Sequence, residues 1–496
     1  MAVVAERPFP PGDYDVVVVG SGPGGLQTSY CLGRLGVRHA VISADEAAGG
    51  MFRRFPTFER LISWTKPDAP YPRDTREYEW YDHNSLVCDE PELRALVPEL
   101  MDRTFDVPSR QEMEGALVAF ADRAGLAVRY GCRWEGTRRE DGGFVLETSD
   151  GEYRCRAAVF ALGVTEPWKA EIPGVEHAPH YAETRSAAEY QGKSVFIVGK
   201  RNSGFEVAHG LLPWASEIVL ASPRPADISV LGRSPLRVRY LQPLDEYSRG
   251  GSGAYVIDAA IEGIERRNGG YHVRTHGTTW KGELFFDVDE VVIATGFRTP
   301  LGDLPRIGVA TVNDGRIPAQ TPFFESVSVP GIYFAGNVTQ GAPGLRKQGL
   351  ASNSTSVNGF RYNARVLARH LAETRFGAIV DRPVVERDQV VPFLLRELGC
   401  APELWIQKGY LTRVLTMGDE VRDEGIVPLE HFVDQGGPNA VAVAIEMDSQ
   451  ARIYPGVYLR TGGKVVEHVL PTHPTHAFDT DPYARELAAR VTPLLR

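Results

Sequence analysis

The most regular feature of the chain is an apolar run that stops at glycine. Residues 16–19 are four consecutive valines, which predicts a strand buried on both faces. Three glycines with GxGxxG spacing follow: Gly20, Gly22 and Gly25. Residues 26–35 predict a helix, and residues 39–42 predict a second strand. This order of strand, glycine turn, helix and strand predicts a dinucleotide-binding unit whose helix N-terminus holds a pyrophosphate.

The end of the second predicted strand departs from the usual pattern of such units. An acidic residue there normally bonds the adenosine ribose, whereas this chain has Ser43, with Asp45 two residues later. Either side chain can bond a ribose hydroxyl, and both remain open. The next segment, Gly49, Gly50, Met51 and Phe52, is predicted to contact the cofactor, because its glycines would let the backbone lie against a flat ligand. A plain loop is the alternative interpretation.

A second, degraded copy of the same pattern lies inside the first. Strands predicted at residues 193–198 and 217–220 flank a helix that runs through residue 212. The intervening turn spans residues 199–204, and in it Arg201 holds the middle glycine position of GxGxxG. Ser222 and Arg224 follow the second strand, and an arginine there suits a 2′-phosphate, which favours NADPH over NADH. A solvated turn residue is the alternative interpretation of Arg224.

Two similar strand ends bracket this second unit. Residues 160–163 read FALG and residues 291–296 read VVIATG, which ends at Thr295 and Gly296. The intervening stretch has about the length of a domain. A third strand, predicted at residues 331–335, is followed by Gly336 and Asn337 and then by a helix-like stretch at residues 350–371, which closes the outer fold.

The remaining segments are less regular. Residues 55–108 are rich in proline and aromatic residues and lack periodicity, residues 109–124 predict a capped helix, and three strands of a β-meander are predicted at residues 127–130, 133–138 and 143–148, before a strand at 153–162. The chain changes character near residue 376, where the pattern predicts helices at 392–398 and 405–417 and strands at 441–447, 452–459 and 464–470.

Together these patterns predict an α/β fold with two nested Rossmann-like dinucleotide-binding domains and a small α+β C-terminal domain. The predicted boundaries are 10–165 and 288–375 for a discontinuous outer dinucleotide-binding domain, 166–287 for an inserted dinucleotide-binding domain, and 376–496 for the C-terminal domain.

Composition and charge narrow the functional classes. The net charge of −10 does not favour a nucleic-acid or anionic-membrane partner, and no stretch is apolar and long enough to span a bilayer. The N-terminus lacks the pattern of a secretory signal, which predicts a cytoplasmic protein. The five cysteines are scattered and none forms CxxC, which argues against a zinc site, a disulphide framework or a dithiol redox relay. No metal site is predicted.

Several of these motifs together resemble the class B NADPH-dependent flavoprotein monooxygenases, which include flavin-containing monooxygenases and amine N-hydroxylases. The resemblance covers roughly residues 10–372 and rests on GSGPGGLQ, GGMF, VGKRNSGFEVA, IATGF and FAGN. Other segments, RLISWTK, DHNSL, NGFRYNARVLARHL and LWIQKGYLTRVL, more narrowly resemble the FAD-dependent oxidoreductases associated with ER degradation and their bacterial relatives. The cellular role of the ER member is not carried over, because this chain has neither a signal nor a retention tail.

The resemblance implies FAD in the outer domain and NADPH in the insert. In such enzymes a flavin C4a-hydroperoxide passes oxygen from O2 to a small-molecule nucleophile, here with an amine nitrogen as a candidate. Residues that carry over as cofactor contacts are Gly20, Gly22, Gly25, Gly49, Gly50, Gly199, Asn202, Ser203, Gly204, Gly336 and Asn337. Lys66 and Asn84 lie in family-like segments at the expected flavin face and are the catalytic candidates. The linker signature FxGxxxH appears only as GVEHAPHY, which leaves the role of His180 open.

Two other functions remain open at this stage. One is a non-oxygenating NADPH-dependent flavin oxidoreductase, and the other is a flavin-stabilised binding or scaffold protein, which the degraded second motif and the C-terminal extension would suit. A homo-oligomer is also compatible with the sequence.

Overall fold

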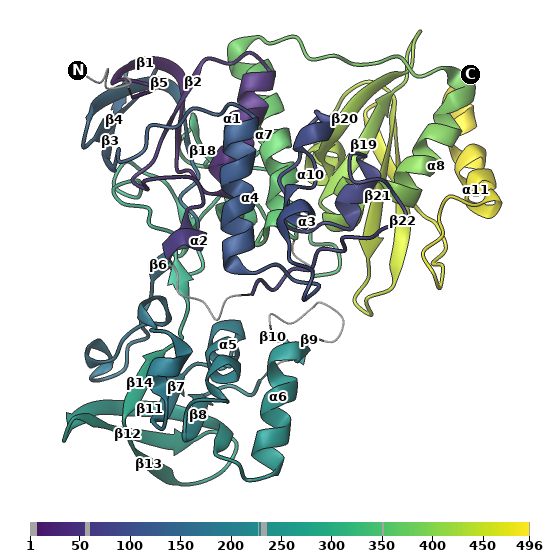
Figure 1. The fold of residues 1–496 in the computed structure, drawn as a ribbon. Helices are drawn as coiled ribbons and strands as arrows, with labels where there is room; N and C mark the ends of the chain where they lie inside the picture. The colour runs from purple at the N-terminus through teal and green to yellow at the C-terminus, as the bar shows by residue number, and fades with distance from the viewer. Residues whose placement is uncertain (1–6, 55–59, 227, 230–235, 350–351, 496) are drawn as a thin grey trace.

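The computed structural model describes residues 7–54, 60–226, 228–229, 236–349 and 352–495. Figure 1 shows two nucleotide-fold units, one above the other, with the C-terminal part of the chain beside the upper one. The fold is α/β, as predicted. Its longer helices are α1 (Pro23–Arg34), α4 (Arg110–Arg123), α5 (Asn202–Leu211), α6 (Val238–Arg249), α7 (Val357–Phe376), α8 (Val390–Cys400) and α11 (Asp481–Val491).

The first unit is built on a six-stranded sheet. Strands β2, β1, β5, β4 and β3 lie in this order, and β18 pairs with β5. Their bounds are β1 (Gly12–Val19), β2 (His39–Ile42), β3 (Trp134–Glu140), β4 (Gly143–Thr148), β5 (Gly151–Phe160) and β18 (Ile332–Phe334). The four valines of β1 are at most 5% exposed, which confirms the predicted buried strand. Helices α1 and α7 pack against each other on one face of this sheet (Figure 1).

The second unit has its own six-stranded sheet. The order is β13, β12, β11, β8, β7 and β14, with bounds β7 (Ser194–Val198), β8 (Glu217–Ser222), β11 (Ala254–Arg267), β12 (Gly270–Gly277), β13 (Glu283–Val288) and β14 (Glu290–Ile293). Strand β14 runs parallel to β7, so it belongs to this sheet, whereas the boundary predicted at residue 288 groups it with the first unit. The long antiparallel pair β11–β12 was not predicted.

A two-stranded ribbon connects the units. Strand β6 (Glu166–Pro167) leads into the second unit and β15 (Phe297–Arg298) leads out of it, and the two pair antiparallel. The chain therefore enters and leaves the second unit at one place.

The C-terminal part forms a five-stranded antiparallel sheet in the order β20, β19, β21, β22 and β23. Its strands are β19 (Leu411–Thr416), β20 (Arg422–Pro428), β21 (Ala440–Met447), β22 (Ile453–Thr461) and β23 (Lys464–Val469), with short helices α9 (Pro402–Ile406) and α10 (Leu429–Asp434). The helix predicted at 405–417 is wrong: α9 ends at Ile406, Gly409 turns the chain with a φ of +66°, and β19 follows.

Two other sequence expectations are wrong in detail. Residues 127–130 form no strand of a meander; instead Arg129 makes a parallel bridge to Ile42 at the end of β2. The helix predicted from residue 350 begins at Val357, and residues 350–351 lie outside the described part of the chain. No helix among the described residues is long and apolar enough to cross a membrane.

The remaining elements are short. They are α2 (Met51–Arg54), α3 (Leu96–Leu100), β9 (Ile228–Ser229), β10 (Leu236–Arg237), β16 (Thr311–Val312), β17 (Ile317–Pro318) and the 3-10 turns η1 (Glu77–Trp80), η2 (Pro91–Leu93), η3 (Val175–His177), η4 (Tyr181–Glu183), η5 (Ala187–Tyr190), η6 (Gly336–Gly341), η7 (Arg387–Gln389) and η8 (Thr492–Leu495).

Candidate functional site

The first glycine turn places the N-terminus of α1 directly at the end of β1. A Cβ atom at Gly25 would lie 1.9 Å from the carbonyl oxygen of Gly20, so only glycine lets the helix approach the strand this closely. Gly24 touches Gly336 in the same way, because its Cβ would lie 2.4 Å from the Gly336 Cα. At Gly22, by contrast, a Cβ would meet nothing nearer than 3.9 Å. That open position is where a ligand phosphate can reach the helix N-terminus.

A cavity of about 670 Å³ lies over this turn and extends to the second unit. Eleven of the residues predicted from the sequence line it: Gly20, Gly22, Ser43, Asp45, Gly50, Met51, Phe52, Asn84, Ser203, Gly336 and Asn337. These residues come from distant parts of the chain. The N-terminal end of α7, at Ser356 and Val357, also faces the cavity. The structure thus brings most of the predicted first-motif residues to one site.

Ser43 and Asp45 lie together at one end of the cavity. The Ser43 hydroxyl is 2.9 Å from the Ser21 hydroxyl and 3.4 Å from a carboxylate oxygen of Asp45. Ser43 is buried and Asp45 is half-buried. Because both side chains line the cavity, this geometry is compatible with either one as the ribose contact.

The structure places the two catalytic candidates, Asn84 and Lys66, in different surroundings. Asn84 is 1% exposed and lines the cavity, and its amide nitrogen donates to the carbonyl of Ser63 and to the hydroxyl of Thr65, both at about 3 Å. Asp82 accepts a hydrogen bond from the Asn84 backbone and fixes this loop. Lys66 is exposed and does not line the cavity; its ammonium lies over the Tyr81 ring, 5.8 Å from the centroid. The structure therefore places Asn84 in the cavity wall and Lys66 outside it.

Two further predicted residues support the cavity without lining it. Gly25 allows the close packing of α1 on β1, and the Gly49 N–H donates to the Ser21 carbonyl at 3.2 Å, which holds the GGMF loop over the glycine turn. The Asn337 side chain, which does line the cavity, accepts from the Val164 N–H at 3.1 Å and joins the loop after β18 to the loop after β5.

The second glycine turn repeats the backbone geometry of the first. A Cβ atom at Gly204 would lie 2.1 Å from the Gly199 carbonyl oxygen, as at Gly25 and Gly20. Arg201 is the N-cap of α5, the place that Gly22 holds before α1, and its side chain is exposed. Burial, and then the nearby guanidinium groups of Arg201 and Arg298, lower the pKa of Arg316, so positive charge is concentrated here. Such a cluster suits an anionic nucleotide.

Of the residues predicted for the second unit, only Ser203 lines the 670 Å³ cavity. The residues that do not line it are Gly199, Asn202, Gly204, Ser222, Arg224, Thr295 and Gly296. The Ser222 hydroxyl donates to the Arg224 carbonyl at 3.2 Å, and the Arg224 side chain is exposed.

Thr295 and Gly296 act at the ribbon between the units. The Thr295 hydroxyl donates to the Trp168 carbonyl at 2.6 Å. The Gly296 carbonyl accepts from the Trp168 N–H, and the His180 ring lies 3.0 Å from the same oxygen. Burial lowers the pKa of His180, so the ring that contacts the Gly296 carbonyl is a neutral imidazole. His180 therefore helps to hold in place the segment that connects the two units.

Sequence reasoning missed several residues of the cavity. The indole of Trp134 lines it and is held by hydrogen bonds to Gly136 and Thr137, and Phe360 enters from α7. Tyr181 and Glu206 enter from the second unit. No local pattern marks these positions. Trp134 begins β3, where it pairs with Thr148 of β4, and its ring packs against Phe160 of β5 with centroids 4.9 Å apart.

The described residues contain no group of His, Cys, Asp and Glu that could hold a metal ion. All five cysteines are free, and none of them lines the cavity. Burial raises the pKa of the Cys31 thiol to about 11 and of the Cys155 thiol to about 12, which disfavours the reactive thiolate.

Comparison with known proteins agrees with this geometry. The profile of the family described as pyridine nucleotide-disulphide oxidoreductase matches residues 17–336. A zebrafish (Danio rerio) FAD-dependent oxidoreductase domain-containing protein 2 is 30% identical over 223 residues, which are 44% of this chain and 32% of that protein. The chain thus matches about a third of the length of this relative.

Other relatives match different fractions of this chain and of their own length. A ferredoxin–NADP reductase of Thermus thermophilus is 28% identical over 65% of this chain and 84% of its own length. Indole-3-pyruvate monooxygenase YUCCA1 of rice (Oryza sativa subsp. japonica) is 28% identical over 40% of this chain and 46% of its own length. The solved flavin-containing monooxygenase from Stenotrophomonas maltophilia has the same fold, with a TM-score of 0.55 and 20% identity over 73% of this chain and 98% of that chain.

Proposed function

We propose, from the premise that this chain belongs to the pyridine nucleotide-disulphide oxidoreductase family, that it is an NADPH- and FAD-dependent monooxygenase of small molecules. The net reaction converts a nucleophilic substrate, O2, NADPH and a proton into oxygenated substrate, NADP⁺ and water. Bound FAD would supply the redox chemistry by accepting hydride and activating O2. The protein's own residues bind the cofactors, orient them and exclude water.

One observation carries the proposal: a single cavity joins the first glycine turn to Ser203 of the second turn and contains no cysteine. Two nucleotides bound at these turns would meet inside it. A disulphide reductase of this family needs a dithiol beside the flavin to receive electrons, and this cavity offers none. Electrons must therefore leave to a small molecule or to another protein.

The residues present fit FAD in the first unit. Gly22 leaves the α1 N-terminus open, Gly24 and Gly336 bring two loops into direct contact, and Ser43 or Asp45 stands where a ribose would lie. We assign NADPH to the second unit, where the α5 N-terminus, Arg201 and its arginine neighbours offer positive charge. On this assignment the second unit runs through β14, to about residue 294.

The substrate proposed is an amine, which would be oxygenated at nitrogen. On the side of the second unit the cavity is lined by the carboxylates of Glu166 and Glu206 together with the rings of Tyr181 and Phe297. Carboxylates and aromatic faces attract cationic amines. Asn84 is the proposed active-site residue on the opposite wall, where its buried amide would orient the flavin or substrate.

A second candidate function has specific support. The alignment of this chain with the Thermus ferredoxin–NADP reductase covers 84% of the length of that protein. A non-oxygenating NADPH-dependent reductase is therefore the alternative. The two functions differ in what happens to O2 after the flavin is reduced.

The test is to reduce the FAD-loaded protein with NADPH without oxygen, and then to mix it with ¹⁸O2 and a panel of amines, thioethers and ketones. The monooxygenase proposal expects ¹⁸O in one substrate, with one NADPH consumed per oxygen transferred. Fast reoxidation that yields only hydrogen peroxide across the whole panel would favour the reductase. FAD that NADPH never reduces would contradict both enzymes and favour a binding protein.

A further inference from the structure

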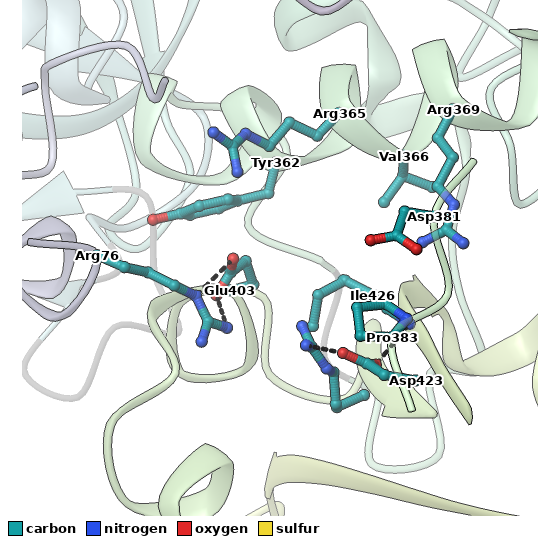
Figure 2. A pocket seen from close by; sticks show the side chains of 12 residues that line it. Arg76, Tyr362, Arg365, Val366, Arg369, Asp381, Pro383, Glu403, Asp423 and Ile426 are labelled. Atoms are coloured by element: carbon teal, nitrogen blue, oxygen red, sulfur yellow. Dashed lines mark hydrogen bonds and ion pairs between the residues drawn. The ribbon is translucent and has the colours of Figure 1, made fainter. Parts of the chain in front are cut away.

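A second cavity, of about 390 Å³, lies between α7 and the C-terminal sheet, apart from the cavity described above (Figure 2). Its walls come from the first unit, including Arg76, Val366 and Arg369, and from the C-terminal domain, including Pro383, Arg413 and Ile426. Figure 2 shows the α7 side chains on one side and Pro383, Asp423 and Ile426 across from them. The volume is within the range of small-molecule sites.

Much of the charge in this cavity is already paired. Arg76 makes bidentate hydrogen bonds to both Glu397 and Glu403, at 2.7–3.2 Å. Arg413 donates through one terminal nitrogen to Asp423. These pairs fix the wall and bind the C-terminal domain to the loop that contains Arg76. Because the charges of Arg76 and Asp423 are already paired, neither side chain is a strong candidate for contacting a ligand.

Two donors in the same cavity are not satisfied within the described part of the chain. The Arg369 guanidinium has a single ion-pair partner, Glu373, at 3.7 Å, which is beyond hydrogen-bond distance. Glu373 is instead held by Arg382 at 2.6 Å. The Nε atom of Arg413 is buried and has no hydrogen-bond partner. A buried donor left unpaired is costly, and in native proteins such a donor usually has a function.

The local backbone is shaped around Arg369. A Cβ at Gly425 would lie 2.3 Å from Nη1 of Arg369, and Gly425 has a φ of +80°, so glycine makes room for the guanidinium. Gly425 pairs with Val414 and Ile426 pairs with Arg413 across β19 and β20. The two unsatisfied donors therefore lie beside the same short stretch of β20. Burial lowers the pKa of Arg369, and the carboxylates around it, Glu373 first, only partly offset this effect.

The geometry points to a binding site for a small organic carboxylate with an apolar body. We propose that its carboxylate bonds the Arg369 guanidinium, while its body lies against Val366, Pro383 and Ile426. A guanidinium fork matches the two oxygens of a carboxylate. The lining carries four arginines and three carboxylates, and two further carboxylates, Glu397 and Glu373, pair with Arg76 and Arg369. The charges around the cavity are therefore nearly balanced, which suits a monoanion better than a phosphate dianion.

The test measures binding of benzoate and hexanoate to the FAD-loaded full chain by isothermal titration calorimetry, with benzamide and inorganic phosphate as comparison ligands. Arg369→Gln should weaken carboxylate binding about tenfold or more, because hydrogen bonds between charged groups are the strong ones. Arg369→Lys, which keeps the charge but loses the fork, should retain part of the affinity. The matched control is Arg375→Gln, on the same helix but outside this cavity, which should bind as the parent does.

The visible flavin spectrum distinguishes this cavity from the larger one, since a ligand beside the flavin would shift its bands. Crystals soaked in 4-iodobenzoate should show an iodine peak between Val366 and Ile426. Binding of neither carboxylate at 10 mM, equal affinity in Arg369→Gln, tighter binding of phosphate, or a flavin shift that saturates with the same Kd would each overturn the proposal. Arg369→Gln should remain folded, because among the described residues Arg369 has only one long ion pair to lose.

Discussion

The substitution Gly25→Ala tests whether the close approach of α1 to β1 holds the cofactor site together. The added Cβ would lie 1.9 Å from the Gly20 carbonyl oxygen, whereas real Cβ contacts stay beyond 3.0 Å. Helix and strand must therefore separate by roughly 1.1 Å, which is far more than a flexible side chain could absorb, because both atoms belong to the backbone.

The energetic cost follows from this displacement. Overpacking a well-packed site costs about 1–3 kcal/mol, and a backbone clash lies at or above the upper end of that range. For a domain of 150–250 residues, about 3 kcal/mol corresponds to a Tm about 6–12 °C lower. The displaced helix N-terminus would also weaken FAD binding, since its N–H groups would no longer converge on the pyrophosphate.

The matched control is Gly33→Ala in the same helix. There a Cβ would meet nothing nearer than the His39 Cε1 at 3.9 Å. Replacing a helical glycine by alanine at an open position stabilises by about 0.5–1 kcal/mol. The same residue change therefore has opposite signs at two positions of one helix.

The assay is thermal unfolding by circular dichroism, together with FAD content per chain from the ratio of flavin to protein absorbance. Gly25→Ala should have the lower Tm and be FAD-poor, while Gly33→Ala should match or exceed the parent in both. A Gly25→Ala protein with full FAD content and a Tm within 1 °C of the parent would refute the reasoning from backbone geometry.

Three further predictions follow from other parts of the structure. Gly204→Ala, whose Cβ would lie 2.1 Å from the Gly199 oxygen, should retain FAD but lose its reduction by NADPH in anaerobic stopped-flow; unchanged reduction would contradict the assignment of the second turn. Burial raises the pKa of Cys400 to about 11, so Ellman's reagent at pH 7.5 should label the native protein slowly, at this half-buried thiol first, and a burst at any other cysteine would contradict this. Burial of His370 against Phe323 lowers its pKa to about 4, below the unfolded value of about 6.5. The folded state therefore loses free energy of unfolding as pH falls from 6.5 toward 4, because protons bind the unfolded chain first. The Tm of His370→Gln should therefore fall less between pH 7 and pH 5 than that of the parent, and parallel curves would contradict the assignment.

The parts of the fold that could be predicted are those specified by short stretches of sequence. The valines of β1, the glycine turn and α1 are local patterns, and they fix the position of Gly22 without information from the rest of the chain. The capping box of Ser109 and Glu112 is local too, and the structure forms it at the start of α4.

The parts that could not be predicted depend on contacts between distant segments. Asn84 and Lys66 lie in equally family-like segments, yet only Asn84 lines the cavity, because Asp82 turns its loop inward. The 405–417 segment is apolar enough for a helix, but its alternation fits β19 once β20 and β21 are beside it. The pairing of Arg76 with Glu397 joins residues 321 positions apart, which no local pattern reveals.

The ribbon of β6 and β15 has a consequence for how this architecture can change over evolutionary time. Pro167 and Phe297 face each other in an antiparallel pair, so their Cα atoms are only about 5 Å apart. To the outer unit, everything between them is equivalent to one long hairpin loop, and the entropy of closing a loop grows only slowly with its length. Residues 168–296 could therefore be excised and replaced by a tight turn, or exchanged for another domain, without a new strand pairing in the first sheet. The outer unit would retain its fold, but the large cavity would lose the part of its wall that Tyr181, Ser203 and Glu206 form.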